Sequence, residues 1–380
     1  MRRFFPLLLL CLALMPGYAR AVLVEDLYRV ELPIEDQSTA KRLDAFNEAF
    51  RQLLIKISGS DAAFENPGLK RPLSNSSRYV LQFRYVMRKQ APLAEVPAQA
   101  TDVSDAAGGV SADASEIDVL HLIVTFNREL VESLLRENGV PLWGRERPSS
   151  LLLVHYSESN AAGILLSGDT EAAIVNEFDE QARRKGLPIL FPLLDLEDRA
   201  ILGGALDLLP DAARMEALAL RYAPDVMVSG VVNSMARDSW QARWQARFND
   251  KLFNWSNRAS SRQQLIDQSL AQLASTLASE YALASGPVAD QDVLFRVEGV
   301  TDVRDYIRVL NYLQSLDAVE EAGLVRIESQ LVTYRVRLRN SAEDLHRLIA
   351  LGYVLEQVDL PQINAAEENQ VVRLNYRLIP

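Results

Sequence analysis

Hydrophobic residues recur along this chain at two spacings, every second position and every third or fourth, so the pattern predicts alternating strands and helices. In the first third, residues 38–57 have the spacing of an amphipathic helix, with Ser38 as its N-cap and Gly59 just past its end. A second helix follows the Asn127 cap. Predicted strands cover residues 24–32, 79–87 and 117–125. The order strand, helix, strand, strand, helix predicts an α+β domain over residues 22–145.

A second domain is predicted over residues 150–285, where strands and helices first alternate and include a buried strand over residues 187–194. Residues 240–248 then alternate Trp, Ala and Phe with Gln and Arg, which is typical of a strand with one buried face. Asn249-Asp250 predicts a hairpin turn into the next strand, and a long helix ends before the break at Ser285-Gly286-Pro287. A sheet with both kinds of connection is expected to be mixed.

The last domain, residues 290–380, follows the order β-α-β-β-α-β, which predicts a ferredoxin-like sandwich with both helices on one sheet face. Residues 371–378 predict an additional strand at the edge. Residues 90–116 differ, because they contain no aromatic and no basic residue and are dominated by Ala, Asp, Ser, Pro and Gly. They predict a disordered insertion in the first domain. We therefore expect α/β and α+β domains with small mixed sheets.

The N-terminal segment, residues 1–21, has the three parts of a secretory signal peptide. Arg2 and Arg3 precede an apolar stretch over residues 4–15, and Ala19-Arg20-Ala21 matches a cleavage site. No stretch in the chain reaches the roughly 18 to 20 apolar residues that a membrane-spanning helix needs. We predict cleavage after Ala21 and export to the periplasm of a Gram-negative bacterium. Retention of the segment as an uncleaved anchor is the alternative.

Cleavage changes the charge and the cysteine content of the chain. The formal net charge of the 380 residues is -11, and loss of Arg2, Arg3 and Arg20 makes it -14. Cys11, the one cysteine, is lost as well, so the mature chain has neither a disulfide nor a cysteine-ligated metal site. Such an acidic chain is poorly suited to nucleic acid, which is bound mainly by clustered Lys and Arg. No cofactor and no metal site are predicted.

The sequence contains none of the motifs G-x-S-x-G, G-x-x-x-x-G-K-[ST], G-x-G-x-x-G, H-E-x-x-H and C-x-x-C. The weak catalytic candidates are His155, at the end of a predicted strand, and Asp195 and Asp198, which follow another strand. The favoured interpretation of the two carboxylates is a helix cap and a favourable interaction with the helix dipole. His121 and His346 fit structural or surface positions better than catalytic ones.

Arg335, Arg337 and Arg339 alternate with core-facing residues along a predicted strand of the last domain. Their face is expected to be free of helices, so they form either a patch for an anionic ligand or, as favoured, a solvated surface. No aromatic residue shares the face, which disfavours stacking with RNA bases. The tryptophans at positions 240, 244 and 255 also leave two interpretations, a sugar-stacking surface or, as favoured, core packing.

Five sequence blocks carry a family resemblance. They are AFNEAFRQLLIKISGS, SSRYVLQFRYV, GLPILFPLLDLED, RYAPDVMVSGVV and VEGVTDVRDYIRVLNYLQSLDAVEEAGL. Together they resemble the secreted proteobacterial family catalogued as domain of unknown function 2066, over most of the mature chain outside the insertion. This resemblance implies no reaction, cofactor or catalytic residue. The middle domain is also loosely similar to periplasmic accessory domains of the curli-secretion and penicillin-binding-protein-activator type, which implies binding to envelope proteins.

Export, several small domains and the lack of catalytic motifs together predict a non-enzymatic binding or assembly module of the cell envelope. Envelope proteins are the expected partners, and a glycan or an anionic ligand is a further option. Neither nucleic acid nor a membrane-spanning segment is expected after cleavage. The alternative function is a periplasmic hydrolase of cell-wall or phosphate-containing substrates that uses His155, Asp195 and Asp198.

Overall fold

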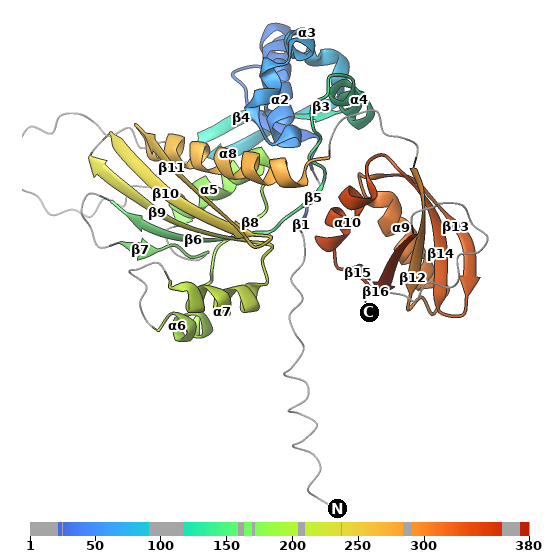
Figure 1. The fold of residues 1–380 in the computed structure, drawn as a ribbon. Helices are drawn as coiled ribbons and strands as arrows, with labels where there is room; N and C mark the ends of the chain where they lie inside the picture. Colours follow the sequence, from blue (N-terminus) through green and yellow to red (C-terminus); the bar gives the residue numbers. More distant parts are fainter. Residues whose placement is uncertain are drawn as a thin grey trace, which may run out of the picture.

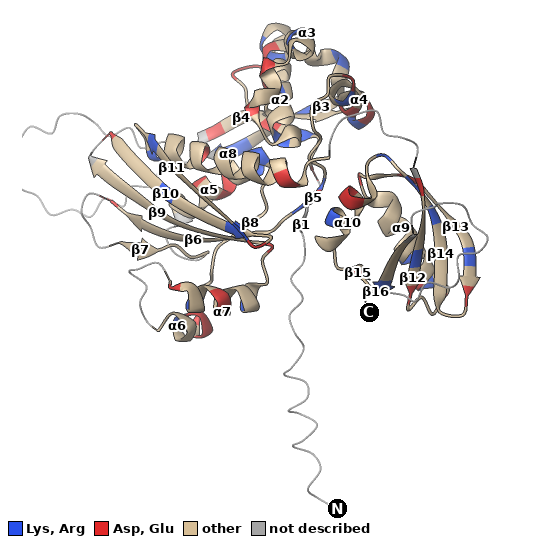
Figure 2. Cartoon of the chain, viewed as in Figure 1, with Lys and Arg blue, Asp and Glu red and all other residues tan. Residues whose placement is uncertain are grey.

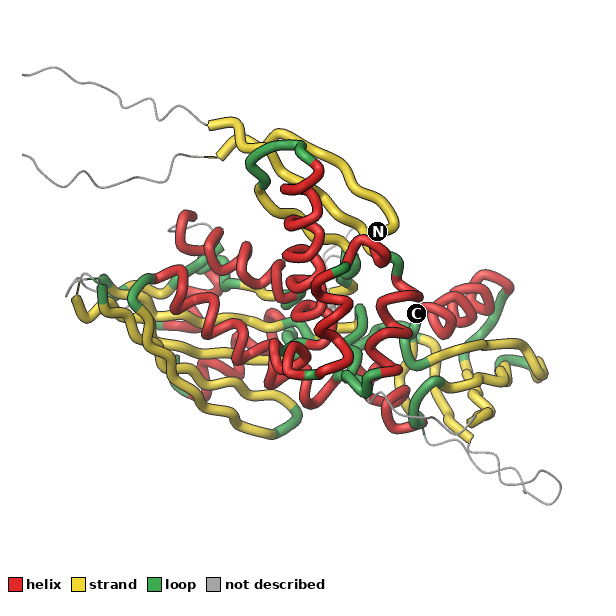
Figure 3. The backbone as a smooth tube through the Cα atoms, turned by 90° about the horizontal axis from the view of Figure 1, so that it is seen from above, coloured by secondary structure: helices red, strands yellow, loops and turns green. Residues whose placement is uncertain are grey.

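Three sheet-containing domains make up the structure (Figure 1). The computed structural model describes residues 22–24, 26–90, 117–158, 163–168, 172–203, 210–236, 238–283, 291–358 and 373–379. Seen from above, the sheets lie on the outside and many of the helices lie between them (Figure 3). The predicted combination of α/β and α+β domains with mixed sheets is confirmed. Across the described ranges, no helix has the length and apolar character needed to cross a membrane.

The N-terminal domain packs helices against a three-stranded antiparallel sheet with the order β2-β4-β3. Its elements are β1 (Val22–Leu23), β2 (Arg29–Pro33), α2 (Thr39–Ser58), α3 (Lys70–Ser74), β3 (Val80–Gln90), β4 (Ile117–Phe126) and α4 (Arg128–Glu137). The predicted helix boundaries are confirmed, because the side chains of Ser38 and Asn127 cap α2 and α4 and Gly59 follows α2 in the left-handed conformation. The buried face of α2 supplies the largest share of the core, and β4 and α4 add to it.

Three sequence predictions about strands and loops need correction. Residues 24–32 are not one strand, because a turn closed by the Arg29 amide and the Asp26 carbonyl separates β1 from β2. Residues 187–194 contain only β8 (Ile189–Leu190), since the prolines on either side at 188 and 192 lack the N–H that a sheet ladder needs. The insertion was predicted from Gln90, which instead ends β3. Residues 91–116 and the predicted signal peptide lie outside the described residues.

The middle domain is a mixed sheet with the strand order β11-β10-β9-β6-β7, to which β8 adds beside β6. Its elements are β5 (Glu146–Arg147), β6 (Ser150–Ser157), β7 (Ile164–Leu165), α5 (Ala172–Lys185), α6 (Leu196–Leu202), α7 (Ala212–Tyr222), β9 (Val226–Ala236), β10 (Ser239–Phe248), β11 (Lys251–Ala259) and α8 (Arg262–Tyr281). β6 runs parallel to β8 and β9, and the β9-β10-β11 meander is antiparallel, as predicted. Asn249 and Asp250 both have positive φ angles, as a tight hairpin turn requires.

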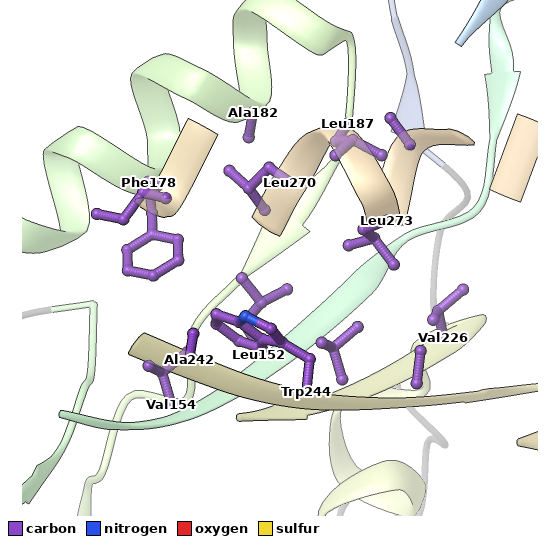
Figure 4. Close-up of a cluster of buried hydrophobic side chains, with 14 of the residues drawn as sticks. Leu152, Val154, Phe178, Ala182, Leu187, Val226, Ala242, Trp244, Leu270 and Leu273 are labelled. Carbon is purple, nitrogen blue, oxygen red and sulfur yellow. The ribbon is translucent and has the colours of Figure 1, made fainter. Parts of the chain in front are cut away.

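Helices cover the two faces of this sheet unequally. α5 and α8 pack along one face, where Phe178 and Leu270 lie over Leu152 and Trp244 (Figure 4). On the opposite face, α6 and α7 form a small second core under β6. This second core reaches Met227 of β9, and the same face of β10 and β11 stays exposed. The middle sheet therefore has one covered face and one partly open face.

The C-terminal domain has the predicted element order, with an extra strand inserted into the sheet. Its elements are β12 (Gln291–Glu298), α9 (Val303–Ser315), β13 (Val319–Glu328), β14 (Leu331–Leu338), α10 (Ala342–Ala350), β15 (Leu355–Gln357) and β16 (Arg373–Leu378). The strand order is β13-β14-β12-β16-β15, so the predicted edge position of β16 is wrong. β16 lies parallel to β12, where Tyr376 stacks on Phe295 with 4.6 Å between ring centroids, and it displaces β15 to the edge.

The two outer domains share one topology. In each, the first, second and third strands of a β-α-β-β-α segment lie in the sheet order first, third, second, and all neighbours are antiparallel. The strand pairing therefore gives the two outer domains the same arrangement of these strands. The domains differ at the first strand, because β16 covers the free edge of β12 whereas β2 pairs only with β4 in the described chain.

A fully buried arginine joins the N-terminal and middle domains. Arg147 donates hydrogen bonds to the carbonyls of Lys56, Lys185 and Gly186, at 2.6, 3.0 and 3.0 Å. It also donates to the carbonyls of Trp143 and Gly144, and its guanidinium lies 4.0 Å from the Trp143 ring centroid. Lys56 lies in the last turn of α2 and Lys185 ends α5, so the partial negative charges of two helix C-termini face one cation.

A second polar cluster joins the C-terminal domain to the N-terminal domain. Asp317, just after α9, pairs with Arg128 of α4 and accepts a hydrogen bond from the Arg145 amide at 2.9 Å. Glu146 is buried next to this cluster, and neither carboxylate oxygen has a hydrogen-bond partner among the described residues. Burial, and then the nearby Asp317 carboxylate, raise the pKa of Glu146 to about 7.

Replacement of Arg147 by Met is expected to destabilise the protein by about 3–5 kcal/mol, because several buried carbonyls lose their donor at once. Urea denaturation followed by circular dichroism measures the change. Arg184→Gln is the control, since Arg184 is an exposed residue paired only with Glu180 in the same helix and should change stability by less than about 0.5 kcal/mol. Equal urea midpoints for the Arg147 variant and the wild type would contradict the assigned role of Arg147.

Glu146→Gln is expected to stabilise the protein at pH 8 by about 1–3 kcal/mol and to have little effect at pH 4. The unfolded chain releases this proton near pH 4.5, whereas the folded chain holds it to about pH 7. Stability therefore falls as the pH rises between these values, and the glutamine removes that loss. Melting temperatures across the pH range test this, with the exposed Glu320→Gln as control. A shift of the same size at pH 4 and pH 8 would rule out ionisation of Glu146 as the cause.

Candidate functional site

The open face of the middle sheet is the candidate site, and we call the outward-facing residues of β9, β10 and β11 the basic sheet face. They alternate with the tryptophans, phenylalanines and valines that face α5 and α8. The basic sheet face consists of Met227, Ser229, Val231, Asn233 and Met235 on β9, Gln241, Arg243, Gln245 and Arg247 on β10, and Leu252, Asn254, Ser256 and Arg258 on β11. The period-two pattern of β10 thus sets both the core and the site.

Three exposed arginines give this face its charge. Arg243, Arg247 and Arg258 have neither an ion pair nor a hydrogen bond from the guanidinium within the described residues. The face contains no Asp and no Glu, and basic residues mark β10 and β11 in Figure 2. The chain has a net charge of -11, so these three arginines create a local positive field on a largely acidic molecule.

A hollow of about 380 Å³ lies on this face between β10 and β11. Its lining residues are Gln241, Ala242, Arg243, Ser256, Asn257 and Arg258. Arg243 lies opposite Ser256, and Arg258 lies opposite Gln241, so the two arginines are diagonal neighbours across the strand pair. The hollow therefore combines two cations with an amide and a hydroxyl on a rigid sheet.

His155 lies on the same face but is shielded. It pairs with Val231 of β9, which in turn pairs with Arg243, so the three residues form one row across the sheet. Its Nε2 atom is buried and has no hydrogen-bond partner in the described chain. Gly163 packs directly against the ring, because a Cβ atom there would lie 2.1 Å from it. The Nε2 atom of His155 is thus covered by its own chain, whereas the residue as a whole is half-buried.

Asp195 and Asp198 lie at the start of α6 in a network of hydrogen bonds and ion pairs. The Asp195 carboxylate accepts from the amides of Glu197 and Asp198, which makes it the N-cap, as favoured from the sequence. Arg221 pairs with both carboxylates, and its hydrogen bonds hold the pKa of Asp195 well below its usual range. Asp198 is fully buried and also accepts from the Tyr222 hydroxyl.

The three catalytic candidates are therefore not brought together as a site. No hydrogen bond or ion pair joins His155 to Asp195 or Asp198 in the part of the chain that the structure describes. Among all the residues that the structure describes, no group of three or more His, Cys, Asp or Glu side chains is placed to hold a metal ion. The two carboxylates stabilise α6 and α7, and the hydrolase alternative stays a prediction without geometric support.

The second predicted site, the arginine strand β14, is largely neutralised. Tyr334, Val336 and Leu338 are buried, as predicted, so the arginines lie on the other face. Arg337 pairs with Glu321 at 2.9 Å and with Asp292 at 3.6 Å, and the Arg339 Nε donates to the Val319 carbonyl. Arg335 alone has no such partner among the described residues. A single uncompensated arginine is a weaker anion site than the basic sheet face.

The tryptophans at 240, 244 and 255 pack in the core between the sheet and helices α5 and α8. Core packing is therefore confirmed for them, and they do not form a sugar-stacking surface. The sequence reasoning identified the alternation in β10 but used it only to find the core. Gln241, Arg243, Gln245 and Arg247 had been noted merely as the polar half of the pattern. The arginine spacing was a usable signal, but the absence of acidic partners depends on strand register and became visible only in the structure.

Comparisons with known proteins give a partial family match and distant matches to solved structures. The family described as Domain of unknown function (DUF8605) matches residues 21–144. A comparison with curated proteins gave no match. Similar solved structures include Protein Y N-terminal domain from Thermus thermophilus (11% identity, covering 34% of this chain and 94% of that chain, TM-score 0.18), hypothetical protein CT253 from Chlamydia trachomatis (12%, 35% and 99%, 0.23) and lipoprotein GNA1162 from Neisseria meningitidis (15%, 35% and 99%, 0.21). None of these similarities supports a conclusion about function, and the resemblance to domain of unknown function 2066 stays a prediction.

Arg221→Gln is expected to destabilise the protein by about 2–4 kcal/mol, because the buried Asp198 carboxylate loses its cation. The matched control is Arg214→Gln in the same helix α7, where the arginine is exposed and lies 3.7 Å from Asp211. Urea denaturation compares the two variants with the wild type. If both variants lose the same small amount of stability, the network around α6 is not structural.

Proposed function

We propose that this protein is an exported, non-enzymatic binding module in the envelope of a Gram-negative bacterium, and that it holds an anionic envelope component on its basic sheet face. One observation carries the proposal: among the described residues, three arginines without partners lie on an open sheet face that has no carboxylate. Export is supported by the signal-peptide pattern of residues 1–21.

The position of the arginines on a sheet supports specific binding over general attraction. Strand backbones fix the Cα positions, and the side chains of Arg243 and Arg247 leave the same face of β10 about 13 Å apart. Below them, Trp244 packs between Phe178 and Trp255 in the core, which holds the strand in place. A charged array on a rigid element keeps its spacing when a ligand binds, so less conformational entropy is lost.

The chemistry of the face supports binding without turnover. Its outward-facing polar groups are guanidinium, amide and hydroxyl groups, and serine needs an adjacent general base to act as a nucleophile. The nearest histidine in the same row, His155, is shielded by Gly163. Arginine stays protonated at physiological pH, so it stabilises an anion but does not exchange protons with it. The hydrolase alternative has no comparable arrangement in its favour.

The proposal predicts that Arg243, Arg247 and Arg258, changed together to Gln, lose envelope binding while the fold is kept. The full chain, with a photo-crosslinking amino acid at Ser256, is expressed in a Gram-negative host and irradiated. Wild-type protein is expected in the periplasmic fraction, crosslinked to an envelope component, and the triple variant is expected to lose at least tenfold in yield. Its melting temperature should change by less than about 2 °C, because exposed side chains are replaced.

The matched control changes Arg335, Arg337 and Arg339 together to Gln and should leave crosslinking at position 256 unchanged. Equal crosslinking by the wild type and the Arg243/Arg247/Arg258 variant would contradict the proposal. Recovery of the chain outside the periplasmic fraction would contradict its export. A hydrolase activity that Asp195→Asn or His155→Ala removes would contradict the non-enzymatic assignment.

A further inference from the structure

We propose that the hollow between Arg243 and Arg258 is a binding site for a phosphate group, carried by an envelope lipid or glycan or present as free phosphate. This inference rests on the proposed function and names the chemical group that the basic sheet face recognises. The hollow is the part of the face where two unpaired arginines and two neutral hydrogen-bonding side chains meet.

Strand geometry places the two arginines within reach of one anion. Diagonal neighbours on an antiparallel pair have Cα atoms about 7–8 Å apart. Arg243 and Arg258 are such neighbours, since each lies opposite the residue two positions from the other on its own strand. An arginine side chain extends about 6–7 Å from its Cα, so both guanidinium groups converge over the hollow without movement of the backbone.

The number of donors favours phosphate over a carboxylate. Each guanidinium carries five N–H donors in a planar fork, and one fork satisfies a carboxylate through two parallel hydrogen bonds. A second arginine would then have no acceptor. A phosphate monoester has three terminal oxygens and a charge near -2, so it accepts from both forks at once and balances both cations. Gln241 and Ser256 add neutral donors beside the arginines.

The neighbouring rows of the face mark the limits of the site. Next to the hollow, the Gln245 amide donates to the Asn254 side chain at 3.1 Å, so these two residues satisfy each other. One row further, Arg247 lies opposite Leu252 and outside the lining residues of the hollow. Arg247 therefore contributes to the general field of the face but not to the hollow itself. The matched control is Arg335 of β14, an exposed arginine on another sheet whose guanidinium has neither an ion pair nor a hydrogen bond among the described residues.

The same face gives no means of recognising an attached base or sugar ring. Its outward-facing residues include no aromatic side chain on β9, β10 or β11, and base or sugar binding relies on stacking against aromatic rings. Recognition is therefore expected to be restricted to the phosphate and its immediate ester. Affinity for a nucleotide should equal the affinity for a simple phosphate monoester.

Isothermal titration of the full mature chain at low ionic strength tests the site with inorganic phosphate, glycerol 3-phosphate and acetate. Wild type and Arg335→Gln are expected to bind both phosphates, and the Arg243→Gln/Arg258→Gln double variant is expected to bind them at least tenfold more weakly. Acetate should bind at least tenfold more weakly than phosphate to the wild type. Cosedimentation with phosphatidylcholine vesicles, with and without phosphatidic acid, tests whether a lipid carries the group.

The outcomes test separately whether the hollow binds phosphate and which molecule carries the phosphate group. Loss in the double variant with retention in Arg335→Gln supports the hollow, and selective sedimentation with phosphatidic acid assigns a lipid source. Phosphate binding without sedimentation assigns a non-lipid source. Equal weakening by Arg335→Gln, or acetate binding as tight as phosphate binding, overturns the phosphate site. If neither phosphate nor vesicles bind while crosslinking at Ser256 still depends on the arginines, the phosphate site fails and the proposed function stands.

Discussion

The arrangement of the first two domains depends on solvating one buried positive charge without a carboxylate. Arginine does not lose its proton in a protein interior, so the chain must bring enough acceptors to Arg147 to replace water. Five backbone carbonyls do this, and those of Lys56, Lys185 and Gly186 come from the ends of two helices in different domains. Helix C-termini have carbonyls without intrahelical partners, so the arrangement satisfies donor and acceptors together. Gly186 makes it possible, because a Cβ atom there would lie 2.5 Å from the guanidinium.

Local structure could be predicted from the sequence where a few neighbouring residues determine it. Ser38 and Asn127 cap the helices that the sequence assigned to them, because each cap forms within four residues. Asn249-Asp250 forms the hairpin because both residues tolerate positive φ. The period-two alternation of residues 240–248 correctly identified which side chains face the core. The polar half of the same alternation forms the candidate site. The sequence therefore identified these residues but not their role.

Features that depend on pairing between distant segments could not be predicted from the sequence. No local sequence signal predicts that β16 lies between β12 and β15. That position depends on a stacking contact between Phe295 and Tyr376, which are far apart in the sequence. The two arginine strands show the same limit. Both have alternating arginines, but β14 lies beside Glu321 and Asp292 whereas β10 lies beside Ser256 and Val231. Charge compensation belongs to the strand register and not to the strand, so the sequence alone could not rank the two.

The buried arginine also constrains the order in which the chain can fold. Its three distant acceptors lie 91 residues before it and 38 to 39 residues after it, so the joint closes only after α2, β5 and α5 have all formed. Contacts between distant segments form late, because ordering the intervening chain comes first. Until then, the end of α2 keeps its open carbonyls, and Gly59 lacks its neighbour Ala278 of α8. A fragment cut at the predicted boundary after residue 145 would stay in this unfinished state, because the cut removes the arginine that completes the N-terminal domain.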